Sequence, residues 1–453
     1  MRKYTILFLS IIIFFFLYFF IKYNVQNNTE LFVKYKTKIP IKTKYKIRKF
    51  LTNLNTLYFY KKNSFEFEKR KKNVLLNKNI PGDELHLYTN SDLIFTGPRA
   101  YFASNKENLF LITGTGVLMT IPLNEISKNN EKIQFKKINT NLNEFTKKYK
   151  DGGRFFSKTS IVKSLLYKNE IFLVSIVQKF RENCYKHVIL EGELKKNKIL
   201  FKEFFKIDEC RTFYIDYVGG TLADYKNDKI LYTVGDWAIC EDPRWLENNE
   251  KGFCTKNSAQ SMSSALGKIY EINFYTKESN IISIGHDNPQ GIVYDSKNNI
   301  IFSTEHGPKG GDELNINIDP STISIKNYGY PISSYGEHYG NPDDPKIKNK
   351  YEEAPLHKSH KKYGFEEPLD YFVPSIGISD IEKLDNKLLI ASMGGNISKG
   401  QLSFYIYTLN SMQEIENKER FTINERIRDI HILENYIVLF LESTGTIALY
   451  ERN

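Results

Sequence analysis

The chain has 453 residues, 41% of them hydrophobic and 14% aromatic, so it is long enough for one large β domain or two ordinary domains, and global disorder is excluded. The formal net charge is +11, and much of this net charge comes from one short stretch, residues 34–49. No zinc-ligand spacing, RNP-like aromatic motif or helix-turn-helix pattern accompanies this charge. We therefore expect a solvated basic linker and no nucleic-acid partner.

The N-terminus carries the clearest local signal. Arg2 and Lys3 precede an apolar and aromatic run from Ile6 to Ile21, which is close to the length of a membrane-spanning helix. No small-residue cleavage site follows this run, so we predict a retained signal anchor over residues 1–23, which would make the protein a single-pass inner-membrane protein. Positive charge flanks both ends and does not fix the orientation.

A basic linker is expected over residues 24–76, and the globular domain over residues 77–453. The linker follows the hydrophobic segment directly, so contact with anionic lipid headgroups is an alternative role for its charge. We expect the globular domain to lie in the periplasm or the extracellular space, attached to the membrane through the N-terminal helix.

A polar turn followed by a short apolar strand recurs six times in the rest of the chain. The copies are KENLFLITGTG from Lys106, KNEIFLVSI from Lys168, NDKILYTVGD from Asn227, NNIIFSTEHG from Asn298, DNKLLIASMGG from Asp385 and ENYIVLFLES from Glu434. The equivalent apolar positions are Leu109, Ile171, Ile230, Ile300, Leu388 and Ile437. Few segments between the copies have helical periodicity, so the pattern predicts an all-β fold, a six-bladed β-propeller.

The four cysteines, Cys184, Cys210, Cys240 and Cys254, form an even set, which is compatible with two disulfides in an exported domain. Three pairings are open. We expect local pairing, Cys184 with Cys210 and Cys240 with Cys254. The alternative is four buried thiols in a reducing compartment.

Two neighbouring segments are dense in Gly, Pro, His and carboxylates: GHDNPQG at residues 285–291 and, after a strand, EHGPKGGDELN at residues 305–315. Tight turns of Gly and Pro expose backbone carbonyls, and Asp312 and Glu313 add anionic oxygens, which together suit a hard cation such as Ca²⁺. An ordinary hairpin turn with surface carboxylates is the alternative.

These paired motifs resemble the signature of the soluble PQQ-dependent glucose and aldose sugar dehydrogenases, the glucose/sorbosone dehydrogenase family, of which the chain looks like a divergent member. The resemblance covers roughly residues 90–453, because further segments follow in the family's order. These are YVGGTL and YTVGD within residues 217–236, AQSMSSALGKIYEI from Ala259, NYGYPISSYG from Asn327, VPSIGISD from Val373 and ERIRDI from Glu425.

The resemblance implies a six-bladed propeller that holds pyrroloquinoline quinone (PQQ) over a calcium ion near the axis. The matching positions are Asn288, Gln290, Arg426 and Arg428 for the cofactor, Gly307 and Pro308 for the active-site calcium, and Asp312 and Glu313 for a second calcium. Arg426 and Arg428 alternate, which puts both on one face of a strand. A surface arginine pair beside Glu425 and Asp429 is the alternative.

The chain departs from the family at the positions that carry the chemistry. Tyr217 stands where the resemblance implies the catalytic His, and a phenol with its ordinary pKa of about 10 is a poor base at neutral pH. Thr221 and Asp287 replace arginines, and residues 393–395 read Met-Gly-Gly where a Lys is frequent. An anion at position 287 would repel an anionic cofactor.

A charged, Pro-containing insertion spans residues 337–362 and contains His338, His357 and His360. We expect it to be a solvent-facing loop. His286 and His306 lie inside the signature motifs, where they are expected to support the calcium turns.

Two functions fit the sequence. The first is a membrane-anchored quinoprotein, an oxidoreductase that oxidises a sugar or related alcohol with PQQ and Ca²⁺ and uses Tyr217 or a water as an unusual base. The second is a non-catalytic propeller that binds a glycan or a protein through its channel face. Neither substrate nor oligomeric state follows from the sequence.

Overall fold

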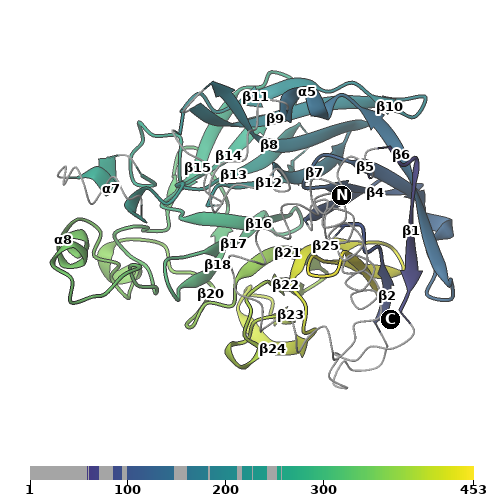
Figure 1. The fold of residues 1–453 in the computed structure, drawn as a ribbon. Coiled ribbons are helices and arrows are strands. Elements are labelled where there is room, and N and C mark those ends of the chain that lie inside the picture. Colours follow the sequence, from purple (N-terminus) through teal and green to yellow (C-terminus); the bar gives the residue numbers. More distant parts are fainter. Residues whose placement is uncertain are drawn as a thin grey trace, which may run out of the picture.

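The computed structural model describes residues 59, 61–70, 85–93, 99–146, 161–181, 184–211, 217–226, 228–241, 252–256 and 258–452. These residues form six antiparallel units of four strands arranged in a ring (Figure 1). The first strands of successive units contact each other, and contact between the first strands of the sixth and first units closes the ring. The predicted six-bladed propeller is therefore confirmed in the described part of the chain.

The strands of each unit follow one another from the axis outward. The first three units are β3 (Ala100–Ser104), β4 (Asn108–Thr113), β5 (Leu118–Pro122) and β6 (Lys132–Thr140); β7 (Val162–Lys168), β8 (Ile171–Arg181), β9 (Cys184–Lys195) and β11 (Lys202–Lys206); and β12 (Gly219–Tyr225), β13 (Lys229–Val234), β14 (Lys268–Asn273) and β15 (Ser279–Ile284). The last three are β16 (Asn288–Asp295), β17 (Ile300–His306), β18 (Asp312–Ile318) and β20 (Asp370–Phe372); β21 (Ile378–Leu384), β22 (Lys387–Ser392), β23 (Ser403–Leu409) and β24 (Ile415–Thr422); and β25 (Ile427–Ile432), β26 (Tyr436–Leu441), β27 (Thr446–Glu451) and β2 (His86–Thr89).

The remaining elements are short. They are the strands β1 (Ser64–Lys69), β10 (Lys198–Ile199) and β19 (Lys326–Asn327), the helices α5 (Leu142–Thr146), α7 (Phe253–Lys256) and α8 (Pro345–Glu353), and the 3₁₀ turns η1 (Leu123–Glu125), η3 (Ile239–Glu241), η4 (Lys361–Tyr363) and η5 (Ile397–Lys399). At their outer edges, β1 and β10 join three of the units into one continuous sheet.

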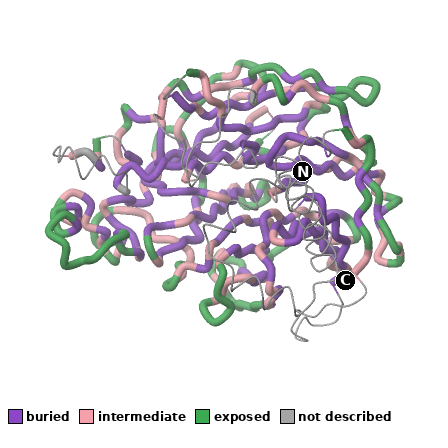
Figure 2. The backbone as a smooth tube through the Cα atoms, viewed as in Figure 1, coloured by how far each residue is buried: buried purple, intermediate pink, exposed green. Residues whose placement is uncertain are grey.

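The second strands form because their apolar residues have neighbouring blades on both faces. In β4, β13, β22 and β26 every residue after the first is buried, which is typical of a strand inside a core. The six equivalent apolar positions all lie at the first or second residue of a second strand, as predicted. Figure 2 shows the buried residues through the middle of the molecule and the exposed ones along the outer turns.

The N-terminal part of the chain completes the last unit. β2 pairs antiparallel with β27, and β1 pairs with both β2 and β6. β1 alternates between exposed residues and the buried Phe65 and Phe67, so it is a strand with one face in the core. The linker predicted for residues 24–76 is therefore wrong over residues 64–69, because these phenylalanines need burial.

The rest of that linker up to residue 58, and the anchor predicted for residues 1–23, lie outside the described residues. Within the described ranges, no helix is long and apolar enough to cross a membrane. Cys184 is bonded to Cys210 and Cys240 to Cys254, each pair with Cα atoms 5.0 Å apart, so the local pairing is confirmed.

A buried arginine fixes the point of closure. The side chain of Arg70, 3% exposed, donates to Glu425 Oε1 at 2.8 Å, to Thr89 Oγ1 at 2.7 Å and to Thr446 Oγ1 at 2.7 Å. One guanidinium thus joins the segment after β1 to β2 and to the last unit. A charge at this depth is tolerated only because Glu425 compensates it.

We expect Arg70→Met to lower the free energy of unfolding by about 3–5 kcal/mol, because it leaves Glu425 as an uncompensated buried charge. Urea denaturation followed by circular dichroism measures this. Lys132→Met is the matched control, since the Lys132–Glu66 pair is 59% and 40% exposed, and it should leave stability nearly unchanged. Equal losses in both variants would contradict a special role for Arg70.

Candidate functional site

The antiparallel order of each unit puts the start of its first strand beside the end of its second strand. The segments that carry the candidate residues occupy these ends. Tyr217 precedes β12, Asn288 begins β16 and Arg426 precedes β25, whereas Gly307 and Pro308 follow β17. The structure therefore brings the predicted site to one face of the ring.

A small cavity lies where the six innermost strands meet at the axis. Its volume is about 30 Å³, and its polar lining includes Arg99, Lys163, Gln290, Asp380, Arg428 and Asp429. A space of this size holds water, whereas organic ligands need several hundred cubic ångströms. A planar cofactor would therefore lie across the mouth of this channel and not inside it.

The two arginines predicted to bind the cofactor share one carboxylate. Arg426 Nε donates to Glu442 Oε1 at 2.5 Å, and Arg428 donates to Glu442 Oε2 from Nη2 at 2.6 Å and from Nε at 2.8 Å. Although burial alone raises it, the charges of Arg428, Arg426 and Arg99 lower the pKa of Glu442 to about 2. Arg428 lies in β25 and Arg426 directly precedes it, and both guanidinium groups reach the same carboxylate.

Only one of these arginines is accessible from outside. The side chain of Arg426 is 40% exposed, whereas that of Arg428 is 4% exposed. Further donors of Arg426 contact the carbonyl and the sulfur of Met393, the residue that stands where the family frequently has a Lys. Arg426 is thus the arginine that can meet a ligand directly, and Arg428 orients the carboxylate beside it.

The carboxyls in the channel hold protons near neutral pH. Burial raises the pKa of Asp380 to about 7 and that of Asp429 well above its ordinary value. Each also accepts a backbone N–H, Asp380 from Ile430 at 2.8 Å and Asp429 from Phe102 at 2.7 Å. Arg99, Lys163 and Arg428 line the same channel, and cations suit a ligand with several carboxylates.

The amides of Asn288 and Gln290 lie at the same channel mouth. Asn288 Oδ1 accepts from Gly219 N at 3.0 Å and from Gln290 Nε2 at 2.8 Å. Gly219 has φ +62°, and a Cβ there would lie 3.0 Å from Gly235 N and Pro289 O. A glycine is required because β12 and β16 approach each other so closely.

Tyr217 is positioned by a turn that the sequence did not single out. Trp237, with φ +62°, donates its backbone N–H to Tyr217 O at 3.0 Å. Its indole N–H donates to His187 Nε2 at 3.1 Å, and His187 Nδ1 lies 2.8 Å from Tyr232 Oη. Burial lowers the pKa of His187 to about 3, so the ring is neutral, and the indole contact assigns its proton to Nδ1.

Asp287 faces the protein interior and not a ligand. It is 3% exposed, its carbonyl accepts from Asp236 N at 2.7 Å, and its carboxyl is hydrogen-bonded to that of Asp236. Burial is the main reason that the pKa of Asp236 is raised to about 7. The carboxyl of Asp287 is thus directed towards Asp236 inside the fold, and its repulsion of an anionic cofactor stays a prediction.

His286 and Glu305 join the two signature motifs. His286 Nδ1 lies 2.6 Å from Glu305 Oε2, and its Nε2 lies 2.8 Å from Ser283 Oγ. A serine hydrogen-bonded to a histidine, which is hydrogen-bonded to a carboxylate, is also the arrangement of hydrolase triads. However, Ser283, His286 and Glu305 are at most 3% exposed. A substrate does not reach this serine, so the group holds the turns in place.

The two carboxylates expected to bind a second calcium are not brought together. Asp312 and Glu313 are consecutive residues of β18 and point to opposite faces. Asp312 Oδ2 accepts from Gly377 N at 2.7 Å and from Ile378 N at 3.0 Å, whereas Glu313 Oε1 lies 3.2 Å from His360 Nε2. Each carboxylate has protein partners, and calcium at this pair stays a prediction.

In the turn that contains Gly307 and Pro308, a carbonyl oxygen expected to bind calcium already accepts a hydrogen bond. Pro308 O accepts from Gly311 N at 3.2 Å. Among the described residues, no group of three or more His, Cys, Asp or Glu is arranged to hold a metal ion. Backbone carbonyls can also bind calcium, so calcium at Gly307 and Pro308 stays a prediction.

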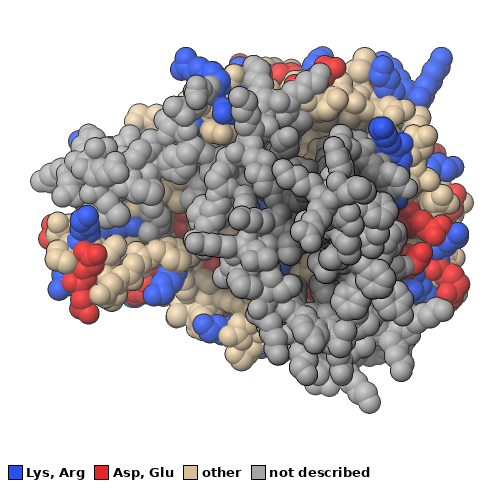
Figure 3. Space-filling model, in the orientation of Figure 1, with Lys and Arg blue, Asp and Glu red and all other residues tan. Residues whose placement is uncertain are grey.

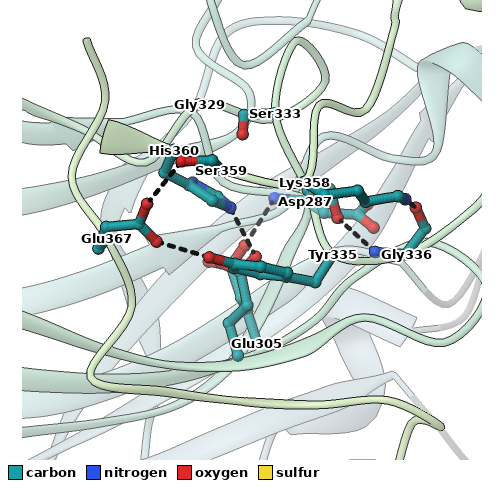
Figure 4. A network of polar contacts seen from close by, with 12 residues as sticks. Asp287, Glu305, Gly329, Ser333, Tyr335, Gly336, Lys358, Ser359, His360 and Glu367 are labelled. Carbon is teal, nitrogen blue, oxygen red and sulfur yellow. Dashed lines mark hydrogen bonds and ion pairs between the residues drawn. The ribbon is translucent and has the colours of Figure 1, made fainter. Parts of the chain in front are cut away.

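The insertion at residues 337–362 is not simply a solvent-facing loop. His338 and His360 are 3% and 1% exposed, and His338 Nε2 lies 2.7 Å from Ala354 O. Figure 4 shows His360 beside Tyr335 and Glu367, and the rings of His360 and Tyr335 stack with centroids 5.3 Å apart. The burial of His360 was missed because its partner Glu313 lies on β18, and that of His338 because it depends on how the insertion folds on itself.

A family model described as Glucose / Sorbosone dehydrogenase matches residues 167–450. The chain belongs to this family. Among curated proteins, it is 33% identical over 117 residues to an aldose sugar dehydrogenase of Escherichia coli (25% of this chain, 28% of that protein). It is 26% identical over 140 residues to quinoprotein glucose dehydrogenase B of Acinetobacter calcoaceticus (28% of each).

An uncharacterized protein of Synechocystis is 26% identical over 229 residues, 47% of this chain and 50% of that protein. The chain thus matches half or less of the length of these curated relatives.

Solved structures of the family share the fold over most of their length. A glucose dehydrogenase superposes with a TM-score of 0.56 at 20% identity, over 78% of this chain and 96% of that chain. The soluble aldose sugar dehydrogenase of Escherichia coli gives 0.54 at 18% identity, with the same shares. A PQQ-bound aldose sugar dehydrogenase of Streptomyces coelicolor gives 0.50 at 13% identity, over 82% and 98%. At these identities the likeness establishes the propeller fold alone.

The Asp236–Asp287 pair predicts a dependence of stability on pH. Because the folded state raises the pKa of Asp236 from 3.8 to about 7, its contribution is complete below pH 4 and is lost as the pH rises through 7. Besides Asp287, the charged groups that act on Asp236 are Arg211 and Lys268. The free energy of unfolding of the wild type should therefore fall between about pH 5 and pH 8. That of Asp236→Asn should fall less over the same interval, by on the order of a few kcal/mol.

Chemical denaturation at both pH values measures this difference. Asp208→Asn is the control, since Asp208 is 83% exposed and beside Lys186, and it should retain the pH dependence of the wild type. A wild-type stability that rises over this pH interval would contradict the raised pKa of Asp236.

Proposed function

We propose that the protein is a quinoprotein that oxidises a sugar or a related alcohol, with PQQ bound across the mouth of the axial channel. The observation that carries the proposal is the exposed guanidinium of Arg426 on the face where Arg99, Lys163 and Gln290 line the channel, in a chain that belongs to this family. PQQ carries three carboxylates, so it needs cations and amides at one place.

The roles follow from exposure and hydrogen bonding. Arg426 presents donors to a carboxylate of the cofactor, Arg428 and Glu442 hold Arg426 in place, and Asn288 keeps the amide of Gln290 oriented. When bound, PQQ supplies an acceptor for hydride. A calcium ion at the carbonyls of Gly307 and Pro308 would act as a Lewis acid beside it.

The proton of the substrate hydroxyl must go to another group. Tyr217 is the side chain at the family's base position, and the Trp237 turn fixes its backbone. A phenol or a water beside it is a weaker base than imidazole at neutral pH. We therefore propose slow turnover compared with family members that have a His at this position.

A second function has its own support. Glu442 neutralises part of the charge of the two arginines, and the base position has changed, which together favour a propeller that binds a glycan or a protein through its channel face without catalysis. Figure 3 shows the described Lys and Arg residues interspersed with Asp and Glu around the rim, a distribution that favours a sugar over a nucleic acid.

We further propose that the propeller works outside the cytoplasm, anchored to the inner membrane by residues 1–23. Two disulfides in the propeller support an oxidising compartment, and the apolar run from Ile6 to Ile21 supports the anchor.

The first test is binding of PQQ. Protein incubated with PQQ and Ca²⁺ should retain quinone absorbance after gel filtration, and Arg426→Ala should bind it about 10- to 100-fold more weakly, because a charge-assisted hydrogen bond is lost. Arg420→Ala is the control, since Arg420 bonds Ser403 Oγ at 3.0 Å on an outer strand. No retention at saturating PQQ would favour the binding function.

The second test is Tyr217→His. If the protein is a dehydrogenase, an imidazole at this position should raise turnover by roughly 10²- to 10⁴-fold in a dye-linked assay over a panel of aldoses. The gain should require PQQ and Ca²⁺. Wild-type turnover already equal to that of Tyr217→His would show that the base position is not degraded.

A further inference from the structure

We propose that Tyr339, which the insertion at residues 337–362 places beside Tyr217, is the residue on which the ring of a pyranose sugar stacks. The inference rests on the proposed function in one respect, that a sugar is the ligand of this face. It adds a specificity-determining residue that lies outside the signature motifs.

The first observation is the contact itself. Tyr217 Oη and Tyr339 Oη are 3.5 Å apart, although 122 residues separate them in sequence. Tyr339 is 47% exposed, so part of its surface is accessible to solvent next to the family's base position. A large aromatic surface left accessible at the mouth of a site is typical of ligand contact.

The second observation is that the segment bearing Tyr339 is held rigidly. Lys309 and Glu337 exchange two backbone hydrogen bonds of 2.9 Å, which fixes the insertion to the turn that contains Gly307 and Pro308. His338, directly before Tyr339, is buried, and its backbone N–H donates to Tyr351 Oη at 3.1 Å. An aromatic ring on a rigid segment loses little conformational entropy when it binds a ligand.

The third observation is the polar surface around the ring. Glu337 and Lys358 form an ion pair of 2.9 Å and are 54% and 47% exposed. Sugars present one apolar face and a rim of hydroxyls, so an exposed aromatic ring on a segment that also carries an exposed carboxylate and its ammonium partner suits a pyranose.

The chain offers a matched control. Tyr371 is also 47% exposed, but it lies on the outer strand β20 and stacks on Tyr335 with ring centroids 3.6 Å apart. Removing Tyr371 takes away the same side chain with the same exposure, from an outer strand and without the contact to Tyr217.

The test measures sugar binding directly, by saturation-transfer NMR on the full-length protein with glucose, maltose and the open-chain polyol sorbitol. Tyr339→Ala should weaken binding of glucose and maltose roughly five- to tenfold, the effect of losing one aromatic contact. Tyr339→Phe should retain most of the affinity, because the ring remains. Tyr371→Ala should bind these sugars with the affinity of the wild type. The affinity for sorbitol should be the same in Tyr339→Ala and in the wild type.

The outcomes separate this inference from the proposed function. If the wild type oxidises aldoses and Tyr339→Ala has unchanged affinity and an unchanged KM, the inference is wrong and the dehydrogenase stands. If Tyr371→Ala loses as much affinity as Tyr339→Ala, the effect is structural and the inference is also wrong. If the wild type neither binds nor oxidises a pyranose, both the proposed sugar function and this inference are wrong. A loss confined to Tyr339→Ala and to ring sugars supports it.

Discussion

The closure of the ring is the constraint on which the rest of the structure depends. Each unit buries its faces only against its two neighbours, so the sixth unit must meet the first, and an N-terminal strand is used for this purpose. Arg70 links the segment after β1 to Thr89 of β2 and to Glu425 and Thr446 of the last unit. The channel is lined from all six inner strands, so the placement of each of its charges depends on that closure.

Charge balance inside the channel explains how so many ionisable groups are tolerated there. Two arginines contact Glu442 and lower its pKa, whereas burial raises the pKa of Asp380 and Asp429 despite their backbone hydrogen bonds. Neighbouring carboxyls thus have pKa values shifted in opposite directions, set by whether a guanidinium is in direct contact.

The sequence predicted what depends on local pattern. The six second strands were found because a strand with a sheet on each face is continuously apolar, and the cysteine pairs were found because they are close in sequence. The prediction failed where partners are distant. The partner of Arg426, the inward turn of Asp287 towards Asp236, and the burial of His338 and His360 all depend on contacts between different units or with the insertion. β1 was missed because its strand pattern of only six residues adjoins a strongly basic segment.

The pairing of His286 with Glu305 has a consequence for how relatives of this chain are recognised. These two residues, with Asp312, are among the most distinctive letters of the two motifs, and all three are buried where they support turns. Selection for folding alone would preserve them in a lineage that had lost its enzymatic activity. A match to these motifs therefore identifies shared ancestry of the scaffold, and whether a given descendant is still a catalyst must be judged from the exposed positions at the rim of the channel.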